Sequence, residues 1–291
     1  MQFTIGDARV DVIADIECFA LPAKRFMPTA SLEALLPHRE MLEPDHVDFE
    51  QDTILIGVQA LLLRVAGRNI LVDTCVGEEK PRPARPEWHA RRASGFLEKL
   101  AALGLAPEDI DTVFCTHLHA DHVGWNTRLI DGRWVPTFPR ARYLMGKVEL
   151  EHWLARQAEN PGVNHASFAD SVQPLLEAKL VDTVIDGQEI APGVTLLPLP
   201  GHSPGQMGLR VTRQGERAVF CGDAIHSPVQ ILRPEWSSAF CSDGAEAIRT
   251  RLSLLECAAE ENLLLVPAHF RGCGCARVRK AGEEFRPLFG A

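Results

Sequence analysis

The sequence predicts a mixed α/β fold, and the order of its elements fits two packed sheets with helices on their outer faces. Apolar, β-like runs come first along the chain, and segments of helical periodicity then alternate with further β-like runs. Hydrophobic residues make up 46% and charged residues 24% of the 291 residues, which is ordinary for a globular protein. The chain can therefore bury a sizeable core.

The elements follow in order along the chain. The early β-like runs cover residues 3–5, 10–16, 54–58, 60–65 and 69–72. Helical spacing begins at residues 93–103 and stops near Gly104, and the longest helical pattern covers residues 243–261. Between these two helices we expect strands at 112–115, 141–145, 181–185, 194–199, 207–212 and 217–221, and helices at 147–157 and 164–178. No internal repeat or linker interrupts the pattern.

Residues 116–122 (THLHADH) place three imidazoles and a carboxylate within six positions. Borderline-soft divalent cations bind side chains of these types. His117 and His119 can share one face of an extended backbone at the end of the strand 112–115, whereas Asp121 and His122 arrive after a bend. Two separated ligand sets suit two adjacent ions, and the cluster contains no cysteine of the kind that structural zinc sites usually carry.

Three residues at later strand ends can complete two such sites. His202 lies in the turn-rich segment 200–205, Asp223 follows the β-like run 217–222, and His269 follows the apolar run 263–266. Asp223 could bridge both ions, although an ordinary turn former is the alternative. The expected sets are His117, His119 and His202 for one ion and Asp121, His122 and His269 for the other.

The pattern HxHxDH followed by His, Asp and His resembles that of the metallo-β-lactamase superfamily of hydrolases. The resemblance covers about residues 52–270 and includes residues 70–74, where Asp73 looks like a carboxylate that supports the ligands from behind; a plain strand-end cap is the alternative. It implies an αββα sandwich in a single domain over residues 1–291. It also implies two divalent metal ions at one sheet edge, zinc by default, with manganese, iron or cobalt as alternatives.

The implied reaction is hydrolysis by a hydroxide that bridges the two ions, since metal-bound water has a pKa of about 7 instead of about 15.7 in bulk. Asp121 would orient that hydroxide or pass a proton to the leaving oxygen. His226 stands three residues after Asp223, where homoserine lactonases carry a tyrosine that donates to the substrate carbonyl. His226 could donate in the same way, and a structural histidine is the alternative.

A homoserine-lactonase-like hydrolase of lactones or carboxylic esters is the first function predicted. The runner-up is an organophosphate triester or aryl-ester hydrolase, which would use aromatic contacts with the leaving group. Glyoxalase-type thioester hydrolysis, β-lactam hydrolysis and a non-catalytic or iron-dependent redox role rank lower. Penicillin hydrolases that use zinc commonly carry a cysteine where this chain has Asp223, and fewer than 25 residues follow His269 to form a glutathione-binding domain.

Residues 17–51 interleave apolar side chains with prolines and charges. Related lactonases carry an amino-terminal extension near the metal cleft, so the resemblance is compatible with a lid or dimerisation extension, with Phe26 and Met27 against the substrate. A surface wrap that buries these apolar groups is the alternative. Trp125 follows the ligand cluster closely and is expected to form a pocket wall, unless it packs in the core.

The net charge of -9 and the lack of a Lys/Arg-rich run argue against nucleic acid or membrane partners. A small-molecule substrate is expected, and a homodimer is possible. The absence of a signal-like start favours a cytoplasmic location.

Most of the eight cysteines are expected to be buried, and the sequence does not indicate a role for Cys273 and Cys275. We expect a solvated loop around Arg82, Arg85, Arg91 and Arg92, and exposed side chains at His38, His46, His89, His152 and His165.

Overall fold

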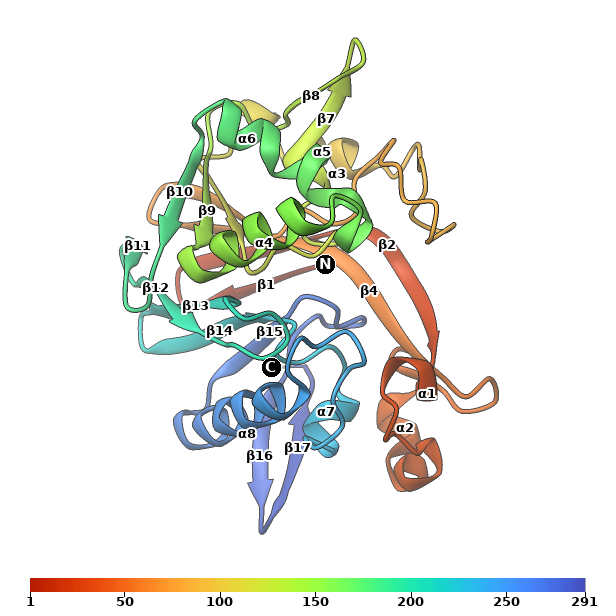
Figure 1. Cartoon of the computed structure of the whole chain (residues 1–291). Coiled ribbons are helices and arrows are strands. Elements are labelled where there is room, and N and C mark those ends of the chain that lie inside the picture. The colour runs from red at the N-terminus through yellow and green to blue at the C-terminus, as the bar shows by residue number, and fades with distance from the viewer. Residues whose placement is uncertain (291) are drawn as a thin grey trace.

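The computed structural model describes residues 1–290 and places two β-sheets against each other with helices outside them (Figure 1). The larger sheet runs in the order β1 (Gln2–Ile5), β2 (Ala8–Pro22), β4 (Thr53–Val65), β5 (Arg68–Val72), β6 (Thr112–Cys115), β9 (Arg142–Gly146) and β10 (Val181–Val184), with β3 (Val47–Asp48) paired to β4. The smaller sheet runs in the order β11 (Glu189–Ala191), β12 (Val194–Pro198), β13 (Met207–Arg213), β14 (Glu216–Gly222) and β15 (Leu264–Pro267).

Side chains between the two sheets alternate with side chains that face the helices. Leu61 and Leu63 of β4 pack with Phe220 and Val266 of the other sheet, whereas Leu62 between them belongs to the cluster on the opposite face. Alternate residues of a strand point to opposite faces, so each central strand is apolar on both. The αββα sandwich is thereby confirmed.

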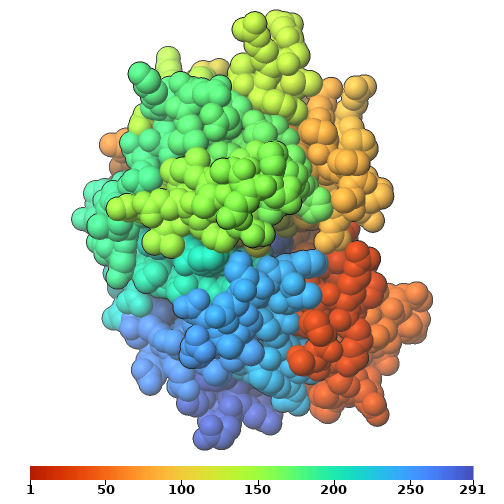
Figure 2. All heavy atoms as spheres, viewed as in Figure 1, coloured from red at the N-terminus to blue at the C-terminus, as the bar shows by residue number. Residues whose placement is uncertain are grey.

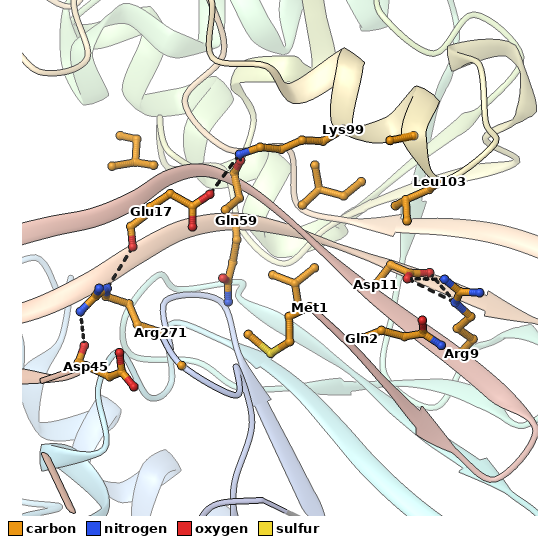
Figure 3. Close-up of a pocket in the computed structure, with 16 residues that line it drawn as sticks. Met1, Gln2, Arg9, Asp11, Glu17, Asp45, Gln59, Lys99, Leu103 and Arg271 are labelled. Carbon is orange, nitrogen blue, oxygen red and sulfur yellow. Dashed lines mark hydrogen bonds and ion pairs between the residues drawn. The ribbon is translucent and has the colours of Figure 1, made fainter. Parts of the chain in front are cut away.

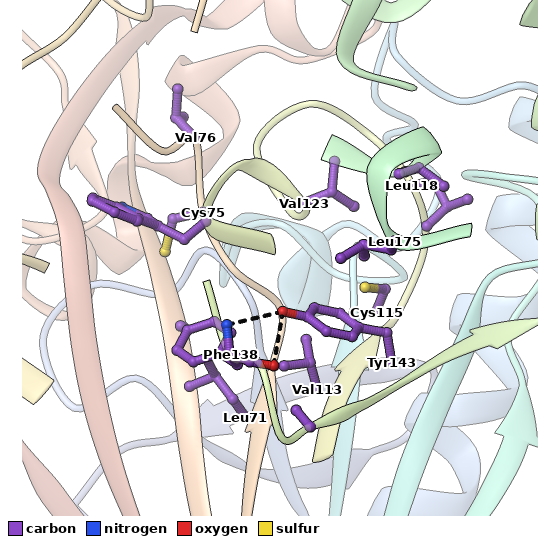
Figure 4. Close-up of a cluster of buried hydrophobic side chains, with 14 of the residues drawn as sticks. Leu71, Cys75, Val76, Val113, Cys115, Leu118, Val123, Phe138, Tyr143 and Leu175 are labelled. Carbon is purple, nitrogen blue, oxygen red and sulfur yellow. Dashed lines mark hydrogen bonds between the residues drawn. The ribbon is translucent and has the colours of Figure 1, made fainter. Parts of the chain in front are cut away.

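Helices cover the outer faces on both sides of the sheets (Figure 1). The larger sheet carries α3 (Phe96–Ala102), α4 (Lys147–Glu159), α5 (Ser167–Ser171) and α6 (Gln173–Glu177). The smaller sheet carries α8 (Gly244–Glu261) and the hairpin of β16 (Arg277–Ala281) and β17 (Glu284–Leu288). The core under the first group includes Tyr143, whose hydroxyl accepts a hydrogen bond from the Phe138 amide at 3.1 Å (Figure 4).

Several predicted elements differ from the observed ones. The runs at residues 54–58 and 60–65 form one strand, β4, because Gln59 continues the β2 pairing between them. The helix expected at residues 164–178 is broken into η4 (Val163–Ala166), α5 and α6, since Asn164 and His165 have positive φ angles and Pro174 restarts the helix. The pattern also missed the hairpin of β7 (Thr127–Ile130) and β8 (Arg133–Pro136).

The amino-terminal extension packs against the body of the protein. It contains α1 (Ala23–Phe26), η1 (Leu32–His38), α2 (Arg39–Leu42) and β3. Its buried side chains, such as Met27 and Leu35, form one apolar cluster with Ile54 and with Trp236 near α7 (Val229–Leu232). Figure 2 shows this red segment beside the blue carboxy-terminal part of the chain, where the Ala239 amide donates to the Phe26 carbonyl at 2.8 Å.

Long cationic side chains cap the outer edge of β2 beyond its short pairing with β1. The carbonyls of Ala14, Asp15 and Glu17 accept hydrogen bonds from Lys99, Arg91 and Arg271, respectively. Lys99 and Arg271 stand on either side of a groove of about 670 Å³ (Figure 3). Such caps keep an edge strand from pairing with another chain. No helix among residues 1–290 is long and apolar enough to cross a membrane.

Candidate metal centre

The seven predicted ligands converge at one edge of the sandwich. His117, His119, Asp121 and His122 lie in the loop after β6, while His202, Asp223 and His269 follow β12, β14 and β15 of the other sheet. Neighbouring strand ends bring these loops together, so residues up to 152 positions apart in the chain reach one site. His117, His122, His202, Asp223 and His269 are all buried.

Asp223 stands between two sets of imidazoles. Its Oδ2 lies 3.3 Å from His202 Nε2 and 3.9 Å from His117 Nε2. Its Oδ1 lies 3.4 Å from His122 Nε2 and 3.2 Å from His269 Nε2. One carboxylate oxygen therefore serves each set, which is the geometry expected of a ligand that bridges two cations.

The remaining ligands complete each set. His119 Nδ1 lies 3.0 Å from His117 Nε2 and 2.9 Å from His202 Nε2, so three ring nitrogens meet at one point. In the second set, the Asp121 carboxylate lies 3.7 Å from His269 Nε2 and 3.9 Å from His122 Nε2. Buried His122 Nε2 and Asp223 Oδ1 have no hydrogen-bond partner among the described residues. Nitrogen and carboxylate donors left open in this way fit divalent cations.

Hydrogen bonds behind the ligands orient the rings. Asp73 Oδ2 lies 2.9 Å from His122 Nδ1, and the same carboxylate accepts from the amide and hydroxyl of Thr116. The Gly57 carbonyl lies 2.7 Å from His269 Nδ1. These partners occupy Nδ1 and leave Nε2 directed into the site, as is typical of metal-binding histidines.

Burial and neighbouring charges set the protonation of the rings. Burial, together with the nearby imidazoles, lowers the pKa of His117 and His202 well below the usual range. Burial also opposes protonation of His122, yet the carboxylates of Asp223, Asp73 and Asp121 together raise its pKa well above the usual range. Neutral rings on one side offer lone pairs to a cation, and the carboxylates supply compensating negative charge.

Glu149, at the start of α4, connects the loops that carry the ligands. Its Oε1 accepts from the Leu118 amide at 2.9 Å and from Trp153 Nε1 at 2.7 Å. Its Oε2 accepts from Ser203 Oγ at 2.5 Å and from the Gly205 amide at 3.1 Å. This fully buried carboxylate ties the His117 to His119 loop to the His202 loop. No local sequence pattern marks Glu149 for this role, because its four partners lie in three separate segments.

A cavity of about 210 Å³ opens directly onto the predicted ligands. Apart from Ile56, His226 and the predicted ligands, its lining comes from four parts of the chain that meet on the face shown in Figure 2. These are the red extension, the orange loop before α3, the green region of α4 and η4, and the blue segment after α7. Its walls beside the ligands are mostly apolar, with Phe19, Leu21, Phe26, Ile56, Trp88, Trp153 and Phe240. The larger groove of Figure 3 contains none of the predicted ligands.

Two residues expected at the substrate lie elsewhere. Trp125 stacks on Phe96 in the core, with ring centroids 5.2 Å apart, because the tight turn at Gly124 packs on the backbone of Val76 and directs the next side chain inward. Met27 is completely buried under the extension. Phe26 does line the cavity, so the extension supplies part of its wall.

His226 lines the same cavity. Its Nε2 lies 3.2 Å from Asp223 Oδ2 and forms no hydrogen bond with any of residues 1–290, while its Nδ1 lies 3.3 Å from Gln230 Oε1. The ring meets that of Phe26 edge-on, with the centroids 5.4 Å apart. His226 is thus held in place and directs one ring nitrogen toward the predicted metal ligands.

Three side chains expected to be solvated are wholly or partly buried. Arg82 is fully buried and donates two hydrogen bonds to Asp170, at 2.6 and 2.7 Å. His46 is buried and stacks on Phe289. His165 lines the metal-facing cavity. Each contact joins segments far apart in the chain, so local composition could not predict it.

The chain belongs to the metallo-beta-lactamase superfamily, whose family model matches residues 54–269. Members of this superfamily typically bind divalent metals, and this chain is a metal-dependent hydrolase. It is 25% identical to the N-acyl homoserine lactonase AiiB of Agrobacterium fabrum (strain C58 / ATCC 33970) over 251 residues, which cover 81% of this chain and 88% of that protein.

Two solved structures share the fold. The hydrolase AbOPH of the beta lactamase superfamily has a TM-score of 0.81 at 22% identity, covering 99% of this chain and 96% of its own. AidC, a dizinc quorum-quenching lactonase in complex with an N-hexanoyl-L-homoserine product, has a TM-score of 0.79 at 19% identity, covering 100% of this chain and 97% of its own. The product in AidC is a small molecule.

Proposed function

We propose that this protein is a dinuclear metal-dependent hydrolase that opens lactones or closely related carboxylic esters. The observation that carries the proposal is the placement of Asp223, since each of its carboxylate oxygens faces a different set of imidazoles. The similarity to N-acyl homoserine lactonases supports lactones as the substrate class. Zinc is the metal proposed, because imidazole and carboxylate donors suit it.

Divalent cations held by these residues would acidify water and polarise the ester carbonyl. Asp121 is less buried than Asp223, the other predicted carboxylate ligand, and it lines the cavity. We therefore assign to Asp121 the transfer of a proton to the leaving oxygen. His226 faces the cavity with an open ring nitrogen and is assigned as a donor to the substrate carbonyl. The apolar walls would exclude water and hold the organic part of the substrate.

A second candidate function is hydrolysis of phosphotriesters or aryl esters. Phe19 and Trp88 stand with ring centroids 6.2 Å apart, and Phe26 and Phe240 stand 5.8 Å apart, around the same cavity. Aromatic walls of this kind suit an aromatic leaving group. We rank this function second because AiiB and AiiA, two relatives of this chain, are N-acyl homoserine lactonases.

A substrate panel separates the two functions. Purified protein is assayed with homoserine lactones, simple γ-lactones, a paraoxon-type triester, a thioester and a β-lactam, before and after chelation and after metal restoration. Lactone turnover that chelation abolishes and zinc restores supports the first proposal. Chelator-sensitive turnover of triesters alone would reverse the ranking.

His226→Phe tests the proposed donor. We expect kcat for lactones to fall by about 10- to 100-fold, because one hydrogen bond to the developing negative charge is lost. Metal content measured by mass spectrometry should stay the same. Unchanged lactone turnover would remove His226 from the mechanism.

We also propose that residues 1–291 act as a single domain. Residues 17–51 would contribute both a cavity wall and a dimer contact. Light scattering of the intact protein tests whether it forms a dimer.

A further inference from the structure

Arg85 is the one Arg or Lys among the described residues that line the cavity beside the predicted metal ligands. Its guanidinium carbon lies 5.5 Å from the ring centroid of Trp88 and 5.5 Å from that of Phe240. These rings come from segments about 150 positions apart in the chain. Cation–π contacts on two rings restrict where the guanidinium can go.

The loop that carries Arg85 is firmly attached to the fold. The Arg85 amide donates to the Arg82 carbonyl at 2.8 Å, and the Arg85 carbonyl accepts from the Trp88 amide at 2.9 Å. Arg82 itself is held by its two hydrogen bonds to buried Asp170. Arg85 therefore projects from a fixed turn rather than from a free surface loop.

Arg85 differs from the other arginines of this segment in having no carboxylate partner. Arg82 pairs with Asp170 at 2.6 Å, Arg91 with Asp15 at 2.7 Å and Arg92 with Glu79 at 3.5 Å. Among residues 1–290, no carboxylate oxygen lies within 4.0 Å of the Arg85 guanidinium, and no side-chain hydrogen bond of Arg85 is formed. A half-buried guanidinium against aromatic walls thus retains open donors.

We propose that Arg85 recognises a second carbonyl oxygen of the substrate, one that lies on the organic group beyond the scissile ester. This inference rests on the proposed lactonase function and names its substrate class: lactones whose side chain carries an amide or keto carbonyl. The aromatic rings around Arg85 suit the apolar chain next to such a carbonyl. A site built to donate to an oxygen discriminates strongly against a substrate that lacks it.

The test compares two lactones in wild type, Arg85→Met, Arg85→Lys and Arg85→Gln. N-hexanoyl homoserine lactone carries the amide carbonyl, and a γ-alkyl-γ-butyrolactone of matched chain length lacks it. We expect Arg85→Met to lower kcat/KM for the first substrate by about 10- to 100-fold and to change the second by less than about threefold. Arg85→Lys and Arg85→Gln should recover part of the loss, because each retains a donor.

Binding provides a readout that does not depend on turnover. Calorimetry with ring-opened N-hexanoyl-L-homoserine and with a hydroxy acid that lacks the amide should show the same selective loss in Arg85→Met. Arg92→Met is the matched control, because Arg92 lies in the same loop, is highly exposed and does not line the cavity. It should leave both substrates unaffected.

The outcomes separate the two proposals. An equal loss on both lactones in all three Arg85 variants, or no loss on either, would overturn the role of Arg85 while leaving lactonase activity intact. If wild type opens neither lactone but hydrolyses triesters, the proposed function itself fails and the assignment of Arg85 to a substrate carbonyl fails with it. Circular dichroism of each variant distinguishes these results from misfolding.

Discussion

Asp223 is the residue on which the candidate centre depends. It is almost fully buried, and five imidazoles lie within 4 Å of its carboxylate: those of His117, His122, His202, His226 and His269. Burial by itself would raise the pKa of this carboxyl, but the surrounding histidines lower it well below its usual range. The ionised form is thus favoured where two cations would need a shared anionic ligand.

Asp223→Asn removes this shared ligand while preserving its size. An amide has a single acceptor oxygen, so it can serve only one set of imidazoles. We expect bound metal, measured by mass spectrometry after dialysis, to fall from the two ions proposed per chain to about one, and kcat/KM to fall by at least about 100-fold. Asp182→Asn, which alters an exposed carboxylate paired with Arg142, is the control. Two retained ions in Asp223→Asn would rule out bridging.

At the scale of elements, α4 and α8 hold the loops of the centre in place. Glu149 of α4 receives four hydrogen bonds from Leu118, Trp153, Ser203 and Gly205. Residues before α8 contact the other histidine loop, since the Asp243 amide donates to the Gly201 carbonyl and the Ser242 amide to the His202 carbonyl, both at 2.9 Å. The positions of α4 and α8 therefore determine where the two histidine loops lie.

Glu149→Gln tests the link through α4. The side-chain amide of glutamine has an NH2 group where the carboxylate had an accepting oxygen. At least one buried N–H or O–H group that donated to Glu149 therefore loses its acceptor. We expect the free energy of unfolding to fall by about 1–3 kcal/mol and zinc affinity to weaken by about 10-fold or more. Glu151→Gln on the exposed side of the same helix serves as control. Equal melting temperatures and zinc affinities for wild type and Glu149→Gln would refute this role.

Asp243→Ala tests the link through α8. The Asp243 side chain accepts from the Glu246 amide at 2.9 Å and caps the helix. Loss of such a cap costs about 0.5–2 kcal/mol, which chemical denaturation can measure. Ser253→Ala, at an exposed position in the same helix, should change the stability by less than about 0.5 kcal/mol. A cap variant as stable as the Ser253 variant would contradict the assignment.

At the scale of the whole molecule, His46 joins three distant segments. It belongs to the amino-terminal extension, and its ring lies 5.1 Å from that of Phe289 and 5.9 Å from that of Phe270. Burial is the main cause that lowers the pKa of His46 to about 4 from 6.5. The folded protein therefore holds this ring neutral at pH values where the unfolded chain takes up a proton.

This difference predicts a loss of stability in mild acid. Between pH 6.5 and about 4 the unfolded state binds more protons at this site, so the free energy of unfolding falls as the pH falls. The leucine of His46→Leu cannot take up a proton. The slope of the free energy of unfolding against pH should therefore be smaller in His46→Leu than in wild type, by up to about 1.4 kcal/mol per pH unit. Denaturation curves at several pH values compare the slopes. Identical slopes in both proteins would show that His46 is not responsible.

Much of the candidate site could be predicted because its ligands belong to short, local patterns. His117, His119, Asp121 and His122 lie within six positions, and each later ligand directly follows an apolar run that forms a strand. Strand periodicity determines which side chains face the core, and strand ends in packed sheets lie at common edges. The fold class, most of the sheet-forming runs and the position of the seven ligands at strand ends could therefore be predicted from local sequence.

The cavity around those ligands was decided by tertiary structure. Trp125 lies three positions after the predicted ligand His122, and yet its side chain packs in the core. Arg85, Trp88 and Phe240, which lie far from the ligands in the sequence, line the cavity instead. The pairing of Arg82 with Asp170 and the break in the helix at Asn164 likewise depend on contacts between distant segments. Periodicity reports only which face of its own element a side chain occupies. Which side chains meet across a cavity depends on how the elements pack, because burial and pairing there are properties of several segments at once.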